Sequence, residues 1–450
     1  MTPPERGPAP AERMTVAIVG DLISTRPIAP MLANDARFAA AIERLNTVDV
    51  AVGNLEFAAA DPDDPEAWIW SMPNDWSIAS DPAAVGDLRD LGFGAVGRAN
   101  NHTMDRGPAG MRTTTLLLDE AGIDHAGAGE DLARAGAPRY HETARGRLGI
   151  VSVTTSPSPP DTAGALDAFA GLAPRPGVHA LAVEPVVTVP GPAHEALRAV
   201  HDLVPDAMGE WMNGDPGLRV FTARFERGDD VSVRYEVDPE GRARLLRSVR
   251  QAAKHADVVI MTVHAHQGDA DPATPPAFLR ELGRDAIAAG ADAVAVSGPH
   301  TLAPVELVDG RPVFFGLGDF IWSDLGGPLP ASFWPRTRAV LGSDIDPATM
   351  TEAELVERLN DDGFTDPWVF RAVQAELVIG PTGVEQVQVH PVDLGQHEPI
   401  TRRGVPRVAE PSVAAEILER LATMSAPFGV TVDVADGVGT VRPRETAPAG

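Results

Sequence analysis

Short β-rich runs alternate with stretches of helical spacing along most of this chain, and this alternation is typical of an α/β fold. The first two runs are 14–20 and 48–52, and the stretch 31–46 between them has the apolar spacing of a helix. Later runs cover 148–154 and 257–269. Polar residues follow the ends of these runs. Because open α/β sheets bind ligands at the carboxyl ends of their strands, we expect a functional site there.

The remaining pattern predicts further local elements. We expect three more helices, over 108–122, 275–290 and 412–426. We also expect two hairpins, over 305–320 and 371–392. Gly122 is the expected C-cap of the first of these helices, since glycine readily adopts the left-handed conformation there.

The chain divides into four expected segments. A disordered N-terminus covers 1–13, one α/β domain covers 14–430, and a C-terminal strand and tail cover 431–450. Within the domain, the segment 156–250 is rich in proline and is predicted to be an insertion. This insertion is either a lid over the site or a passive elaboration, and the sequence leaves both open.

Composition excludes several functions. With 37 Lys and Arg against 64 Asp and Glu the net charge is −27, which disfavours nucleic acid as a partner. The chain has no cysteine, so metal ligands must be His, Asp, Glu or Asn. No apolar run has the length of a membrane span and the N-terminus has no apolar signal core, so we expect a cytoplasmic, soluble protein without a membrane partner. The oligomeric state stays open.

Polar clusters follow several predicted strands, at 20–21, 53–56, 99–105, 264–269 and 297–300, with 318–319 as a sixth. A lone Asp at such a place is more often a turn or cap residue, and a lone His is more often structural. Here, however, four of the chain's 12 histidines fall in three of these clusters. Imidazole and oxygen ligands at one sheet edge favour a shared divalent-metal site.

In order and wording, these clusters resemble the CapA family, which is linked to poly-γ-glutamate capsule synthesis and has the calcineurin-like metallophosphatase fold. The resemblance is carried by GDLISTR (20–26), GNLE (53–56), ANNHTMDRG (99–107), TTTLLLDEAGIDHAGAGED (113–131), VHAHQGD (263–269), GADAVAVSGPHTLAPVEL (290–307) and PVFFGLGDFIWSD (312–324). It extends loosely over 14–430. The fold it implies is an α/β sandwich of two β-sheets flanked by helices, with the Pro-rich segment as an inserted cap.

The resemblance also implies roles for individual residues. The implied metal ligands are Asp21, Glu56, Asn101, His266 and His300. His102 is the implied acid/base histidine, because it follows the asparagine of its motif.

Three positions depart from the metallophosphatase pattern. No histidine follows Asp21 in the usual Asp-x-His arrangement, and Ser297 replaces the first histidine of Gly-His-x-Pro-His. The usual His-Trp-Gly-x-Glu is replaced by HQGD at 266–269, with an additional His264. Fewer nitrogen ligands favour one hard divalent ion, Ca²⁺, Mg²⁺ or Mn²⁺, over the two-metal site of phosphoesterases. No organic cofactor is expected.

One hard ion among several His and Asp residues favours epimerisation. The ion would stabilise an enolate while two bases remove and return a proton. The expected catalytic residues are His102, Asp105, Asp21, His264, His266 and His300, with Asp269 and Asp319 as further carboxylates. The family includes a lasso-peptide epimerase that inverts the C-terminal tryptophan of a precursor peptide, so the resemblance implies a precursor-peptide substrate. A metallophosphoesterase and a non-catalytic component of poly-γ-glutamate synthesis remain alternatives.

Substrate-binding residues are expected near these clusters. Trp68 and Trp322 could form aromatic walls for the substrate side chain, although ordinary packing is the more common explanation for any single tryptophan. Arg26 and Arg98 could bind a substrate carboxylate bidentately, with structural pairing as the alternative.

Overall fold

The computed structural model describes residues 10, 12–61, 63–67, 77–157, 162, 173–203, 218–220, 222–268, 273–323, 333–342, 344–359, 361 and 366–444. Most of the segment 1–13, which was expected to be disordered, lies outside these residues. The same holds for 445–450, the end of the predicted tail.

The larger of the two main sheets has ten strands. Their path is β23-β24-β21-β20-β1-β2-β5-β6, with β19 paired to β1 and β22 paired to β21. The bounds are β1 Met14–Ser24, β2 Val50–Leu55, β5 Phe93–Gly97, β6 Asp124–Ala126, β19 Asp319–Ser323, β20 Arg371–Gly380, β21 Gly383–Asp393, β22 Arg407–Val408, β23 Val430–Ala435 and β24 Val438–Pro443. Since β19, β1, β2, β5 and β6 are parallel, their carboxyl ends lie at one edge.

The second sheet has six strands in the order β17-β18-β16-β15-β9-β8. Their bounds are β8 Arg139–Thr143, β9 Gly146–Thr154, β15 Val258–His264, β16 Ala293–Ser297, β17 Val305–Val308 and β18 Arg311–Phe314. The central strands β9, β15, β16 and β18 are parallel, and the two edge strands run antiparallel to their neighbours. This sheet therefore also gathers its parallel strand ends at one edge.

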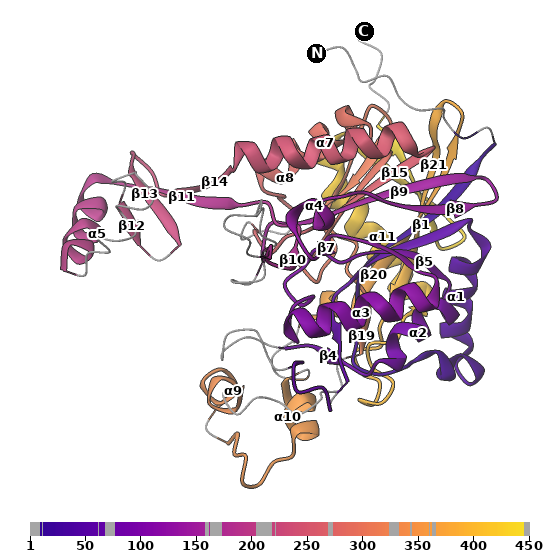
Figure 1. Cartoon of the computed structure of the whole chain (residues 1–450), viewed down its shortest axis with the longest axis horizontal. Helices are drawn as coiled ribbons and strands as arrows, with labels where there is room; N and C mark the ends of the chain where they lie inside the picture. Colours follow the sequence, from indigo (N-terminus) through magenta and orange to yellow (C-terminus); the bar gives the residue numbers. More distant parts are fainter. Residues whose placement is uncertain are drawn as a thin grey trace.

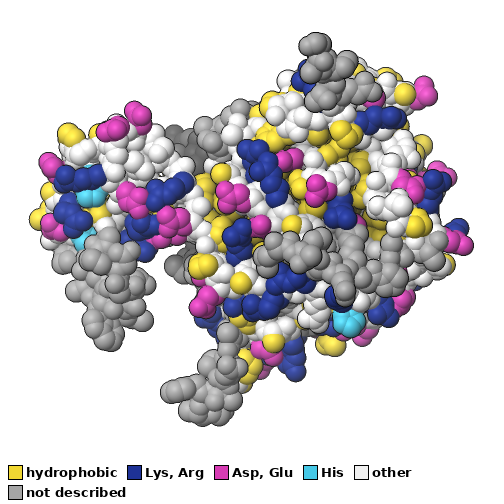
Figure 2. Space-filling view, turned by 90° about the horizontal axis from the view of Figure 1, so that it is seen from above, with side chains coloured by type: hydrophobic (Ala, Val, Ile, Leu, Met, Phe, Trp, Pro, Cys, Tyr) yellow, Lys and Arg dark blue, Asp and Glu magenta, His cyan; other side chains and the backbone are white. Residues whose placement is uncertain are grey.

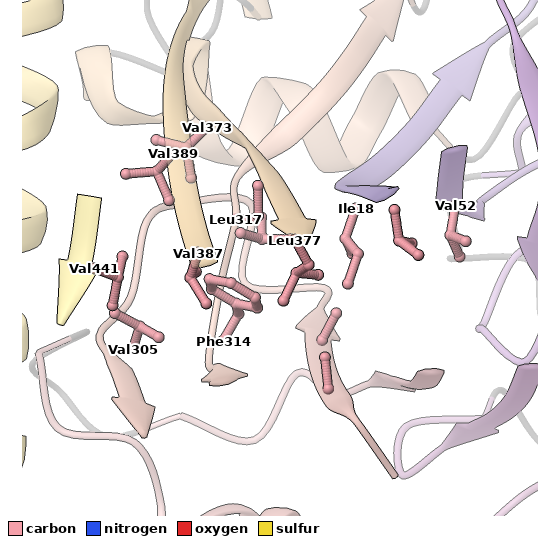
Figure 3. Packing of buried hydrophobic residues seen from close by; sticks show 14 of the residues in the cluster. Ile18, Val52, Val305, Phe314, Leu317, Val373, Leu377, Val387, Val389 and Val441 are labelled. Atoms are coloured by element: carbon pink, nitrogen blue, oxygen red, sulfur yellow. The ribbon is translucent and has the colours of Figure 1, made fainter. Parts of the chain in front are cut away.

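The two sheets pack face to face around an apolar core (Figure 3). On β1, Met14, Val16 and Ile18 face this core, whereas Ala17 and Val19 face the helices on the other side. This alternation is the two-residue period of a strand that is covered on both faces. The second sheet contributes residues from its parallel strands: Leu148, Ile150, Val258, Ile260 and Phe314.

Helices cover the outer face of each sheet (Figure 1). The first sheet packs on η1, α1, α2 and α3, and the second packs on α7 and α8. Their bounds are η1 Ala29–Ala33, α1 Ala36–Thr47, α2 Ala83–Asp90, α3 Gly107–Ala121, α7 Pro239–His255 and α8 Ala277–Ala289. The prediction of a mixed α/β fold is confirmed, and the arrangement is compatible with the sandwich that the sequence resemblance implied.

Several short elements complete the chain. The helix α11 packs against the inter-sheet core beside β21 and β23. The bounds are α4 Leu132–Ala135, α9 Phe333–Leu341, α10 Glu352–Arg358, α11 Pro411–Ser425, η3 Pro367–Phe370, η4 Ala426–Phe428, β3 Ala58–Ala59, β4 Ala79–Ser80, β7 Ala128–Gly129 and β10 Gly177–Val178.

Local sequence signals account for most element boundaries. The expected helix over 31–46 is wrong in one respect, since η1 and α1 are separate. Asp35 interrupts them because its side chain accepts a hydrogen bond from the Phe38 N–H (3.0 Å) and caps α1. The C-cap prediction is confirmed, because Gly122 ends α3 with a φ of 69°. Both predicted hairpins form, as β17–β18 and β20–β21.

Part of the Pro-rich segment forms a small sheet that projects from the sandwich (Figure 1). Its strand order is β12-β13-β11-β14, and α5 packs against it. The bounds are β11 Val183–Val189, α5 Gly191–Leu203, β12 Leu218–Val220, β13 Ala223–Arg227 and β14 Ser232–Val237. The end of the segment, from Pro239 on, belongs to α7 and to the core of the second sheet. A cap over the site is not confirmed by this arrangement.

Charge on the surface is mixed in sign. Figure 2 shows Lys and Arg side chains interspersed with Asp and Glu on both the small projecting sheet and the main body. Within the part of the chain that the structure describes, we find no helix with both the length and the apolarity needed to traverse a bilayer.

Candidate metal and acid/base site

Three strands of the first sheet place polar side chains side by side. Asp21 of β1 is in register with Asn54 of β2 and with Asp319 of β19. The strands approach closely at two glycines, because a Cβ on Gly20 would lie 1.8 Å from the carbonyl oxygen of Gly318. All three polar side chains are buried, and the Asn54 amide donates to Asp21 Oδ1 at 2.7 Å.

Residues at the strand ends of the second sheet contact these three side chains. His264 ends β15 beside Ser297 of β16, and its Nδ1 lies 3.0 Å from Ser297 Oγ and 3.2 Å from Asn54 Nδ2. The N–H of Gly298 donates to Asp21 Oδ2 at 2.9 Å. The strand ends of both sheets therefore form one polar cluster, as the positions of the motifs predicted.

Glu56 lies at the centre of this cluster. It is 0% exposed, and neither carboxylate oxygen has a hydrogen-bond partner among the described residues. His264 Nε2 lies 3.4 Å and His102 Nε2 4.0 Å from its Oε1. Burial, followed by the charges of Asp21 and Asp319, raises the pKa of Glu56 well above its usual value. Such a carboxylate needs either a proton or a bound cation to balance it.

Two groups of residues have the geometry of a metal site, and they share Glu56. One is Glu56 with His264 and His266, and the other is Glu56 with Asp21 and His300. In each group the candidate ligand atoms lie within 4.8 Å of one another. His264, expected only as a catalytic residue, thus belongs with the possible ligands of a divalent ion.

The histidines of the first group suit metal binding. Nε2 of His264 lies 3.1 Å from Nε2 of His266, so the two rings present nitrogen atoms to the same place. Burial and the neighbouring histidines lower the pKa of His264 well below its usual value. Desolvation of the ring, followed by His300, lowers the pKa of His266 to about 4, although part of this side chain is exposed. Both rings are therefore neutral at pH 7, the form that binds metal.

Two further buried side-chain oxygen atoms, Asn101 Oδ1 and Asp319 Oδ2, also have no hydrogen-bond partner among the described residues. Asp319 lies close enough to Glu56 for its charge to raise the pKa of that residue, so their unpartnered oxygens supply carboxylate ligands beside the imidazole nitrogens. This donor set fits a divalent metal ion.

The first histidine–carboxylate pair lies in one loop. His102 Nδ1 is 2.7 Å from Asp105 Oδ2, which also accepts from the Ile78 N–H. Burial raises the pKa of Asp105. Asn100 shapes the loop, since its Oδ1 accepts from the N–H groups of His102 (3.1 Å) and Thr103 (2.9 Å).

The second histidine–carboxylate pair joins the two sheets. His300 Nδ1 is 2.8 Å from Asp319 Oδ1. Burial alone would lower the pKa of His300, but the charge of Asp319, the hydrogen bond to it and the charge of Asp21 raise it to about 9. Burial raises the pKa of Asp319 to about 6, against the effect of the His300 charge. In each pair the carboxylate fixes the orientation of the imidazole ring.

The loop that carries His266 is held by residues that the sequence analysis did not single out. The N–H of His266 donates to Ser156 Oγ at 2.8 Å. The Gln267 amide donates to the Thr155 carbonyl (2.8 Å), and its oxygen accepts from the Thr155 hydroxyl (2.6 Å). Ser156 and Thr155 directly follow β9, so their position at a strand end was the signal that could have identified them.

The predicted substrate-binding residues divide into three groups. Trp322 lies at the site, with its ring centroid 4.9 Å from that of His300 in an edge-to-face contact. Arg26 donates to the carbonyl of Thr401. Arg98 is buried and donates to Thr115 Oγ1 and to the Met111 carbonyl, so it anchors α3 and is not available to a substrate. Trp68 and Asp269 lie outside the described residues.

Comparison with known proteins gives one family. A family model described as "Bacterial capsule synthesis protein PGA_cap" matches residues 15–324, which include every site residue discussed above. An uncharacterized protein of Sinorhizobium fredii, y4sH, is 35% identical over 95% of this chain and 93% of its own length. The PGA biosynthesis protein CapA of Bacillus subtilis is 24% identical over 58% of this chain and 49% of its own length.

Among solved structures, the NAD nucleotidase NadN of Haemophilus influenzae is similar over 91% of this chain and 62% of that chain. The TM-score is 0.32 and the sequence identity is 9%.

Proposed function

This chain belongs to the PGA_cap family of bacterial capsule synthesis proteins, as its motifs predicted, and from this premise we propose that it is a metal-dependent peptide epimerase. One observation carries the proposal. Two histidine–carboxylate pairs, His102–Asp105 and His300–Asp319, lie beside the same buried candidate metal ligands. Inversion of a carbon centre without a redox step requires two such proton-transfer groups.

The two pairs hold their histidines in the same way. In each, the carboxylate contacts Nδ1 of the ring, which leaves the second ring nitrogen for a substrate proton. The second ring nitrogen of His102 lies 4.0 Å from Glu56, which is close enough to place it beside the metal ligands. One histidine removes the α-proton from one face of the carbon, and the other delivers a proton to the opposite face.

Glu56, His264 and His266 are the residues that would hold the metal, because this choice leaves His300 for proton transfer. A divalent cation there would neutralise negative charge that develops on a neighbouring carbonyl oxygen. Its identity stays open among Ca²⁺, Mg²⁺ and Mn²⁺.

The proton balance is simple. The Cα–H bond breaks, its proton passes to the first histidine, and its electron pair moves onto the adjacent carbonyl to give an enolate. The enolate then takes a proton from the second histidine on the other face, and the carbonyl is restored. No oxidant and no other reactant is consumed, and the mass of the product equals that of the substrate.

The proposed substrate is the C-terminal aromatic residue, tryptophan, of a ribosomal lasso-type precursor peptide. Trp322 supports an aromatic side chain here, because it lies edge to face against His300 and so borders the acid/base group. The C-terminal carboxylate supplies the carbonyl group next to Cα, and a divalent cation beside it would make the α-proton more acidic.

A second candidate is a metallophosphoesterase, and one observation favours it. The two ligand groups share Glu56, and a shared carboxylate is suited to two metal ions. In that case Asp21 and His300 would hold the second ion, and only His102 would remain for proton transfer. A component of poly-γ-glutamate synthesis is the third candidate, since the B. subtilis relative is named as a PGA biosynthesis protein.

Deuterium exchange separates these candidates. The protein, loaded in turn with Ca²⁺, Mg²⁺ and Mn²⁺, would be incubated in D₂O with synthetic precursor peptides that end in tryptophan. An epimerase introduces one deuterium at a single Cα. It also forms the D-residue, which chiral analysis of the hydrolysed peptide detects. A phosphoesterase leaves the peptides unchanged and releases nitrophenol from p-nitrophenyl phosphate. Exchange in none of the metal forms would exclude the epimerase.

A further inference from the structure

A groove lies at the junction of the small projecting sheet and the second sheet's helical layer, where β14 contacts α8. One wall is the strand β14, and the other is the start of α8 with the preceding residues 274–276. Its volume is about 1120 Å³, which exceeds the range of about 300–1000 Å³ for small-molecule sites. We propose that this groove binds an extended segment of a peptide, and this inference rests on the proposed peptide-modifying function.

The strand β14 is at the edge of its sheet. It pairs with β11 on one side, from Ser232 to Val237, and no described strand pairs with its other side. Figure 1 shows β14 on the part of the small sheet nearest to α8. An edge strand presents main-chain N–H and C=O groups, which an extended peptide can pair with by adding a strand.

The walls of the groove carry apolar side chains among the polar ones. Tyr235 of β14 and Phe278 of α8 pack with ring centroids 5.4 Å apart. Val231 is 72% exposed and Val233 is 55% exposed, and these are two of only six large hydrophobic side chains recorded as exposed among the described residues. Exposed apolar side chains beside an open strand edge indicate a surface that a partner covers.

Three of the four charged residues that line the groove, Arg234, Arg242 and Arg280, have an acidic partner, and Arg280 lies 3.7 Å from Glu306. Arg234 contacts Glu226 and Glu236, and Arg242 contacts Asp285. Recognition in this groove would therefore depend on main-chain hydrogen bonds and apolar contacts more than on net charge. Such recognition tolerates different side chains, as expected for the part of a peptide that is bound but not modified.

The groove comes near the candidate site in the chain at Gly268. Gly268 lines it, and the Tyr235 hydroxyl donates to the Gly268 carbonyl at 3.4 Å. Gly268 is only two residues from His266, which contacts His264 and lies beside His300. A peptide held along β14 would thus extend toward the histidines that act on its end. This continuity favours a substrate peptide over a second copy of the chain as the occupant.

Gly268 also offers a clean test. Among the described residues, apart from its chain neighbours, no atom lies within 4 Å of a Cβ placed there, so a large side chain fits without a clash with their backbone. Gly268→Trp should fill the groove where it meets the site. Gly191→Trp is the matched control, because Gly191 has equally open surroundings and lies outside the groove.

The probe is a pool of biotinylated random dodecapeptides, and the readout is binding. A photoreactive amino acid would replace Val233 in one protein and Val434, which is exposed on β23, in another. We expect several-fold more peptide crosslinked at position 233 than at 434, a loss of this excess with Gly268→Trp and no loss with Gly191→Trp. Equal labelling at both positions, or crosslinks from 233 to a second copy of the chain, would overturn the proposal.

The two proposals fail in different ways. Crosslinking at position 233 without deuterium exchange would leave a peptide-binding groove on a protein that is not an epimerase. Deuterium exchange without preferential crosslinking at position 233 would support the epimerase and reject the peptide-binding groove.

Discussion

His300 and Asp319 form a hydrogen-bonded pair, Nδ1 to Oδ1 at 2.8 Å, although His300 follows a strand of the second sheet and Asp319 begins a strand of the first. The pair therefore depends on how the two sheets pack. His300 has a φ of 51°, a left-handed conformation that is uncommon for a residue with a Cβ. Such conformations persist where the surroundings enforce them, and they cluster at functional sites.

The first prediction concerns the two acid/base histidines. His102→Gln and His300→Gln should each reduce formation of the D-residue by about 10²- to 10⁴-fold, because inversion needs a proton-transfer group on each face of Cα. Both variants should still bind the metal if Glu56, His264 and His266 hold it. The measurements are the rate of D-residue formation by chiral analysis and the metal content of the purified proteins.

Loss of metal from His300→Gln alone would contradict this assignment. It would place the ion with Asp21, Glu56 and His300 instead, and it would favour the two-metal alternative. Glu130→Gln serves as the control, since Glu130 pairs with Arg112 on the surface.

The second prediction concerns Glu56, whose two carboxylate oxygens are buried without hydrogen-bond partners among the described residues. A metal ion at about 100 times its dissociation constant stabilises a protein by about 2.7 kcal/mol. The wild-type protein should show a higher melting temperature with metal, and Glu56→Gln should abolish that increase. Without metal, Glu56→Gln should melt at or above the wild-type temperature, because burial and the charges of Asp21 and Asp319 disfavour the ionised form of Glu56 and glutamine cannot ionise.

Thermal shift assays with and without Ca²⁺, Mg²⁺ or Mn²⁺ give this comparison directly. An unchanged metal response in Glu56→Gln would show that the ion, if bound, does not use this residue.

Local signals predicted much of the fold from the sequence. Gly122 predicted the end of α3, and the Asp309-Gly310 turn predicted the β17–β18 hairpin, because both depend only on residues close in the chain. The break between η1 and α1 was not predicted. Sequence spacing alone does not distinguish an Asp35 that caps a helix from an Asp35 inside one longer helix.

The site was predicted as a set of residues but not as a set of contacts. The pair His102–Asp105 lies within one loop, and its sequence spacing of three already placed the two together. The pair His300–Asp319 could not be assigned, since it requires the packing of two sheets. Arg98 was expected to bind substrate because its motif lies at a strand end, but its side chain turns inward to α3.

The third prediction tests the close contact beneath the site. In Gly20→Ala the new Cβ would lie 1.8 Å from the Gly318 carbonyl oxygen, so β1 and β19 must separate. We expect destabilisation by about 3 kcal/mol, together with loss of metal binding as Asp21 and Asp319 move apart. Gly86→Ala is the control, because Gly86 lies exposed in α2 with open space around it. It should stabilise the protein by about 0.5–1 kcal/mol. Urea denaturation of both variants is the measurement, and equal stability of the two would contradict the contact.

The fourth prediction concerns stability in acid and uses His125 of β6, which is distant in sequence from the candidate ligands. Burial, followed by the charges of Arg98 and Arg139, lowers the pKa of His125 to about 3. The unfolded chain has an ordinary histidine pKa of about 6.5, so between these two values it binds a proton that the folded protein does not. The contribution of His125 to stability is therefore complete above about pH 6.5 and declines as the pH falls.

Between pH 7 and pH 5 this effect amounts to about 2 kcal/mol, from a slope of about 1.4 kcal/mol per pH unit. His125→Gln removes the titrating group, so the variant should lose about 2 kcal/mol less stability than the wild type over this interval. Urea denaturation at the two pH values measures the difference. His397→Gln is the control, because His397 is exposed in the folded chain and its replacement should leave the wild-type slope unchanged. If His125→Gln and the wild type lose equal stability, then His125 must already be protonated in the folded protein, which would require an opening of its surroundings beside Arg98.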